Sequence, residues 1–202
     1  MLVLTVGSSA RGRPVSFVGS TMVMSNNQPF MVTLSADHTP LRWASFGLNY
    51  QWLNRVDGAA EIFTAEANFL AFRWNASDWQ ANAFLTGNLG GLRHLGLNAA
   101  AVSGAAEADI ESRRWYLLAS SRWIHSLQGY TDVQAMARAG LAPFKAEFDQ
   151  INPWVVIQYQ YMPRFARQQV ITAMLRLLYQ GVLFEIGSSL RGEWLVNFSA
   201  EL

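Results

Sequence analysis

The chain has 202 residues, a formal net charge of +1 and no cysteine. A nearly neutral chain gives no indication of bulk nucleic-acid binding, and the lack of cysteine excludes a disulfide framework and a thiolate metal site. Charged residues make up only 14% of the chain, against about a quarter in typical soluble domains. The only lysine is Lys145, so residues suited to an ordinary hydrated surface are scarce.

The first 14 residues, MLVLTVGSSARGRP, lack the basic start and the long apolar run of a secretory signal. We therefore expect that no native signal peptide is present, and that residues 1–14 are a non-native or poorly ordered segment of a single domain spanning 1–202. No run of about 18 apolar residues occurs, which excludes a transmembrane helix.

From residue 15 onward, apolar and polar side chains alternate over most of the chain. In RWASFGLNYQWL the apolar set is Ala44, Phe46, Leu48, Tyr50 and Trp52, and the polar set includes Asn49 and Gln51. Residues two apart would scatter around a helix, so the alternation predicts strands. The predicted strands cover residues 15–24, 29–37, 42–53, 62–74, 79–88, 94–100, 113–123, 132–140, 154–162, 169–179, 182–190 and 193–202.

The segments between these strands are mostly short turn signals, such as DHTP at 37–40, NASD at 75–78 and NLGG at 88–91. Only 103–112 and 144–153 are longer. Short turns between successive strands indicate an up-and-down meander. The predicted fold is therefore all-β, a closed antiparallel barrel of about twelve strands, with ten as the alternative.

The alternation alone fits either a soluble sheet, with the apolar face inward, or a transmembrane barrel, with the apolar face outward. Three features favour the barrel. The polar face is mostly Ser, Thr, Asn, Gln and Gly, and the apolar face contains many alanines that would fill a core poorly. Aromatic residues also lie near strand ends, and Trp115 and Trp123 are separated by about 20 Å along a tilted strand, close to the height of a membrane barrel's apolar band.

In this pattern the chain resembles bacterial outer-membrane β-barrels as a class. The resemblance implies an outer-membrane location, contact with lipid or detergent, and no cofactor. Such barrels often end on an aromatic residue. This chain departs from that pattern, because its last aromatic residue, Phe198, is followed by SAEL. The residues expected to face lipid, or to form aromatic girdles at the bilayer surfaces, are Phe46, Tyr50, Trp52, Trp79, Trp115, Trp123, Tyr159, Tyr161 and Trp194.

The polar residues of such a barrel would line its interior. The arginines come from later strands than Asp37 and Glu66, so we expect opposite charges on opposite walls and a transverse field acting on small polar or anionic solutes. Alternatively, the same charges pair and plug the barrel. The residues expected to line the interior are Asp37, Asn49, Glu66, Arg114, Arg122, Arg138, Gln158, Arg176, Glu185 and Glu193.

Catalytic or metal-binding chemistry has little support in the sequence. The chain lacks a GxSxG motif, and His38, His94 and His125 show no HxH or HxxxH spacing. Asp37 and His38 are adjacent and are expected to form a turn. We therefore expect a pore or a plugged barrel rather than an enzyme, with a soluble barrel or sandwich that binds an apolar ligand as the rival class.

Overall fold

The computed structural model describes residues 13–147 and 149–202, and these residues form a closed antiparallel barrel of twelve strands. The predicted fold class and strand number are confirmed. The strands are β1 (Thr21–Gln28), β2 (Met31–Leu41), β3 (Ala44–Arg55), β4 (Gly58–Asn75), β5 (Trp79–His94), β6 (Leu97–Ser112), β7 (Trp115–Ser126), β8 (Thr131–Leu141), β9 (Asn152–Tyr161), β10 (Gln169–Tyr179), β11 (Val182–Ser189) and β12 (Trp194–Glu201).

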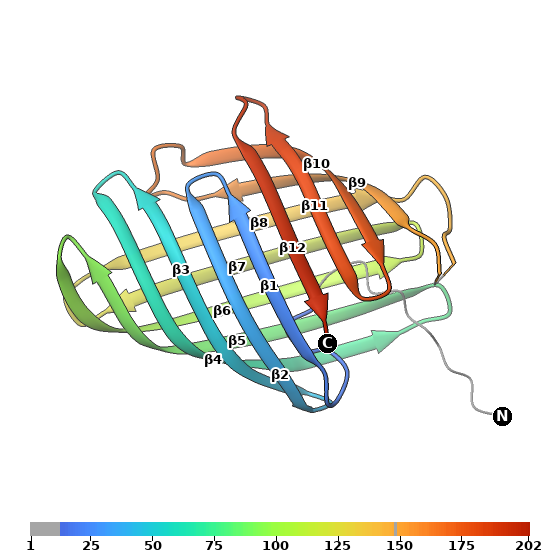
Figure 1. The fold of residues 1–202 in the computed structure, drawn as a ribbon, viewed down its shortest axis with the longest axis horizontal. Helices are drawn as coiled ribbons and strands as arrows, with labels where there is room; N and C mark the ends of the chain where they lie inside the picture. The colour runs from blue at the N-terminus through green and yellow to red at the C-terminus, as the bar shows by residue number, and fades with distance from the viewer. Residues whose placement is uncertain (1–12, 148) are drawn as a thin grey trace.

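Each strand pairs with its neighbours in the chain, and β1 pairs with β12 to close the ring (Figure 1). The strands of the front wall in Figure 1, among them β1, β2 and β12, cross those of the rear wall because barrel strands are tilted. We call the end where β1 begins and β12 ends the terminal end, and the other end the far end. The turns β1–β2, β3–β4, β5–β6, β7–β8, β9–β10 and β11–β12 lie at the far end.

Two predicted boundaries are wrong in the middle of the chain. NLGG and residues 103–112 belong to β5 and β6 rather than to a turn and a loop, and the hairpin turns instead at Leu95 and Gly96. Both turn residues have positive φ, 52° and 78°, as a two-residue type I′ turn requires. Leucine rarely adopts this conformation, so the residue pattern did not mark the turn.

Other boundaries also differ from the prediction. The first strand starts at Thr21 rather than at residue 15. Residues 37–40 continue β2, so Asp37 and His38 lie on a strand with opposite orientations rather than in a turn. The predicted turn at 75–78 and the strand character of the alanine-rich β8 are confirmed. The longest connection, between β8 and β9, starts after Leu141 and ends before Asn152.

The apolar side chains of most strands point outward and the polar ones point inward. On β3, Phe46 and Leu48 are exposed, whereas Asn49 and Gln51 are buried. Ala44 belongs to the predicted outward set but is completely buried. It pairs with Phe69, whose ring stacks on that of Trp43. The interior is apolar near the barrel ends, where one buried cluster includes Leu53 and another includes Trp154.

The outward tryptophan and tyrosine residues of the strands lie toward the two ends of the barrel. At the terminal end these include Trp79 and Trp115, each the first residue of its strand. Toward the far end they are Tyr50, Trp52, Trp123, Tyr159, Tyr161 and Trp194. No helix among the described residues is long and apolar enough to cross a membrane.

Candidate functional site: the barrel interior

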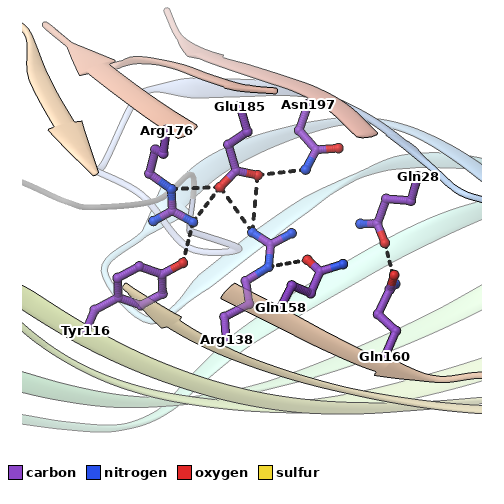
Figure 2. Close-up of polar contacts among 8 residues, drawn as sticks. All are labelled: Gln28, Tyr116, Arg138, Gln158, Gln160, Arg176, Glu185 and Asn197. Carbon is purple, nitrogen blue, oxygen red and sulfur yellow. Dashed lines mark hydrogen bonds and ion pairs between the residues drawn. The ribbon is translucent and has the colours of Figure 1, made fainter. Parts of the chain in front are cut away.

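A buried charge cluster lies on the inner face of β8 to β12. Arg176 donates from Nε to Glu185 Oε1 at 2.7 Å, and Arg138 Nη1 lies 3.3 Å from both Glu185 carboxylate oxygens. Asn197 Nδ2 donates to Glu185 Oε2 at 2.6 Å, and Arg138 Nε donates to Gln158 Oε1 at 2.6 Å. Figure 2 shows Glu185 between the two guanidinium groups. One carboxylate thus contacts two buried cations.

Tyr116 extends this cluster to β7. Its hydroxyl accepts a 2.7 Å hydrogen bond from Arg176 Nη2, and the Arg176 guanidinium carbon lies 4.5 Å from the Tyr116 ring centroid. The ring lies over Gly140, where an added Cβ would come within 2.2 Å of a ring carbon. Gly140 therefore provides the space in which Tyr116 can reach Arg176.

We expect that Gly140→Ala shifts the Tyr116 ring, weakens its contact with Arg176 and lowers the free energy of unfolding by about 1–3 kcal/mol, the usual cost of overpacking. Urea titration of the refolded barrel measures the change. Gly87→Ala is the matched control, because nothing lies within 4 Å of an added Cβ there. An equal loss of stability in the two variants would contradict the assignment.

A second interior cluster contains two carboxylates. Asn68 Nδ2 lies 3.2 Å from Asp37 Oδ1, Glu66 Oε1 and Ser45 Oγ, and its own Oδ1 accepts a 2.6 Å hydrogen bond from Thr86. These residues project from the inner faces of β2 to β5. The wall opposite the arginine cluster is therefore acidic and amide-rich.

A hydrogen bond between β7 and β3 also spans the interior. Arg122 on β7 donates from Nη1 to Gln51 Oε1 on β3 at 2.8 Å, and Gln51 Nε2 donates to Asn49 Oδ1 at 2.7 Å. Since β3 and β7 are not neighbours in the ring, this contact narrows the barrel interior in the half nearer the far end. Glu66, Glu107 and Arg122 remain partly exposed here, unlike the fully buried Glu185 cluster.

At the far end, the β9–β10 loop (residues 162–168) crosses the mouth of the barrel. Phe165 forms a β-bridge with Arg55 of β3, which lies diametrically opposite β9 in the ring, and Val56 N donates to Arg164 O at 3.2 Å. Met162 and Phe165 are buried among the inward-facing apolar residues of this end. The loop therefore crosses and narrows the far mouth.

Polar contacts also join residues from different strands and turns at the far mouth. Arg55 donates to Asp57 at 2.9 and 2.6 Å and lies 4.1 Å from the Tyr130 ring centroid. Burial acts to raise the pKa of Asp57, but the hydrogen bonds and positive charge of Arg55 outweigh it and lower the pKa. Burial raises the pKa of Tyr130 to about 12, so its hydroxyl stays protonated near neutral pH.

At the terminal end, residues 13–20 form a segment that we call the N-terminal strap. Arg13 forms an ion pair with Glu111 of β6, and the Pro14 carbonyl accepts a 2.5 Å hydrogen bond from Ser45 of β3. Ser16 donates to Glu201 of β12, and Val15 is completely buried. Of the segment 1–14 that was expected to be non-native or poorly ordered, residues 13 and 14 make these contacts, and residues 1–12 lie outside the described part of the chain.

Eight of the ten residues expected to line the interior point inward. Arg114 and Glu193 do not lie on strands: Arg114 is exposed in the β6–β7 turn and donates to the Pro143 carbonyl at 3.1 Å, and Glu193 forms an ion pair with Arg167 at the far rim. Both residues directly precede a strand, where alternation no longer determines orientation. The predicted lipid-facing residues all occupy outward positions: Phe46, Tyr50, Trp52, Trp79, Trp115, Trp123, Tyr159, Tyr161 and Trp194.

The predicted separation of charges is wrong for Glu185, which lies beside Arg138 and Arg176 rather than across from them. Sequence reasoning also missed Tyr116 and Asn197. Each lies on the polar side of an alternating segment, Asn197 in 193–202 and Tyr116 on the same side as Arg122 in 113–123, and both could have been found there.

The histidines remain apart, on β2, β5 and β7. His94 faces the Tyr130 ring at 5.3 Å, while His38 and His125 contact Thr21 and Thr131 through Nδ1 at 3.2 Å. Within residues 13–147 and 149–202, no three His, Cys, Asp or Glu side chains are arranged to hold a metal ion. The interior charge clusters are therefore the best candidate functional site.

Comparison with protein-family models finds no match to this sequence, and a search of curated proteins finds no relative. The barrel and its interior are therefore the features from which a function can be inferred.

Proposed function

We propose that the chain is an integral outer-membrane β-barrel that conducts ions or small polar solutes, and that the state described here is closed. The observation that supports a membrane location is the orientation of the side chains, because apolar side chains are exposed on the outside of the barrel and polar side chains are buried inside it. Water would leave this apolar surface unfavourably hydrated, whereas a bilayer would cover it.

The closed state is inferred from the terminal mouth. The N-terminal strap occupies the terminal end, whereas the β9–β10 loop only narrows the far end. Residues 13–17 of the strap are held by contacts that involve side chains, whereas backbone hydrogen bonds join Gly19 and Ser20 to Thr39 of β2. Residues 13–17 can therefore leave without opening the sheet. A barrel that is plugged permanently by its charge clusters is the second candidate, favoured by the complete burial of Arg176 and Glu185.

Conductance in a planar bilayer separates these functions. We expect low open probability for the wild-type protein and frequent opening for Arg13→Glu, because like charges at residues 13 and 111 would repel. The double variant Arg13→Glu/Glu111→Arg restores opposite charges and should close again. If Arg13→Glu stays as silent as the wild type while its barrel is folded, the interior is a permanent plug.

Ion selectivity is a second readout in the opened variant. Arg122→Ala should reduce anion preference, since it removes a partly exposed interior cation. Arg114→Ala is the matched control, because this arginine lies outside the interior and should leave selectivity unchanged. Equal effects of both substitutions would contradict conduction past Arg122.

A further inference from the structure

The outer face carries one pair of opposite charges. Every strand residue is described, and Glu61 on β4 and Arg93 on β5 are the only Asp, Glu, Lys or Arg side chains at outward-facing strand positions. They are direct cross-strand partners near the far end. No hydrogen bond or ion pair is recorded for either side chain in the described part of the chain, so both are available to a ligand.

The pair lies beside an outward depression of about 500 Å³ that spans β3 to β6. Tyr50 and Phe63 line one side, and Gly91 and Ala100 form a low floor next to them. Nothing lies within 4 Å of a Cβ added at Gly91. The charges occupy the row nearer the far end, flanked by Trp52 and Asn98, and the apolar floor lies one row closer to mid-barrel.

We propose that this depression binds one phospholipid with a phosphoethanolamine headgroup. Arg93 would bind the phosphate through its planar guanidinium, and Glu61 would accept hydrogen bonds from the primary ammonium. The glycerol and the upper part of an acyl chain would lie over Gly91 and Ala100, against the Phe63 ring. Trp52 lies in the same row as the charges, at the level where tryptophan favours the bilayer surface.

Charge balance selects this headgroup. An anionic lipid without an ammonium would satisfy Arg93 but place its phosphate beside the Glu61 carboxylate. A choline headgroup keeps the positive charge but has no N–H to donate to Glu61. A phosphoethanolamine headgroup matches both side chains, each contact being a charge-assisted hydrogen bond.

This inference rests on the proposed membrane insertion, and the experiment tests the two separately. The full chain is refolded into phosphatidylcholine vesicles, and a gel-mobility difference between boiled and unboiled samples reports folding. The folded barrel is then transferred to detergent with equal amounts of phosphatidylethanolamine, phosphatidylglycerol and phosphatidylcholine, and native mass spectrometry measures which lipid is retained.

Phosphatidylethanolamine should be retained in preference to the other two. Arg93→Gln should reduce its retention about tenfold, the effect of losing one charge-assisted hydrogen bond. Glu61→Gln should shift the preference to phosphatidylglycerol. Gly91→Leu should fill the depression and abolish retention, whereas two control substitutions should not: Ala137→Leu in another outward depression, and Arg191→Gln in an exposed turn of the far end.

A folded barrel that retains the three lipids equally, or that prefers phosphatidylglycerol before Glu61 is changed, would overturn the lipid site and leave the membrane proposal intact. Failure of the wild-type chain to fold into vesicles would overturn both.

Discussion

Phe46→Arg should prevent most of the protein from folding into lipid vesicles. Phe46 is exposed on the outer face of β3, near the middle of the barrel, and its ring lies edge-on to Phe69 at 6.5 Å. An arginine at the midplane of a membrane barrel costs about 2–4 kcal/mol, and the aromatic contact adds about 0.5–1.5 kcal/mol. The gel-mobility assay after refolding into vesicles measures the folded fraction.

The matched control for this experiment is Asn54→Arg, on the same face of the same strand but next to the far-end turn. A charge there would lie near the bilayer surface, where its cost falls to about 0–1 kcal/mol. If the two variants fold equally well, the outer face does not contact hydrocarbon. A wild-type protein that is monomeric and stable without detergent would likewise contradict the membrane proposal.

Glu185→Leu should be the most destabilising of the interior substitutions. It would remove the carboxylate from two buried guanidinium groups, those of Arg138 and Arg176, and from the Asn197 amide. Breaking a buried ion pair by removing one partner costs about 3–5 kcal/mol, because the remaining charge is buried without compensation. The free energy of unfolding from vesicles in urea measures this loss.

A second variant distinguishes the uncompensated charge from a packing defect. The triple change Arg138→Met, Arg176→Met and Glu185→Leu removes all three charges, and apolar replacements of buried ion-pair networks are often neutral or stabilising. We therefore expect the triple variant to recover most of the stability lost in Glu185→Leu. Asp78→Asn, in the exposed β4–β5 turn, should change little. A triple variant as unstable as Glu185→Leu would contradict the electrostatic explanation.

The errors in strand boundaries share a cause. NLGG resembles a turn locally, but in β5 an added Cβ at Gly90 would come within 2.1 Å of the Phe63 carbonyl oxygen, so the glycine serves close strand packing instead. Conversely, the true turn uses Leu95 in a conformation that leucine seldom adopts. The missed turn and the wrongly predicted one offset each other, and the predicted number of strands therefore remained correct.

The sequence by itself determined the strands, the antiparallel meander and the composition of the two faces, because side-chain alternation is a local property of extended chain. It also identified most interior residues, including Asp37, Arg138 and Gln158, from their position in the alternation. The sequence also favoured an outward apolar face, but only the tertiary structure decided that Glu185 lies between Arg138 and Arg176. It also decided that residues 13–20 and 162–168 cross the two mouths. These contacts join segments distant in sequence, and the tilt and register of a closed ring determine which segments meet.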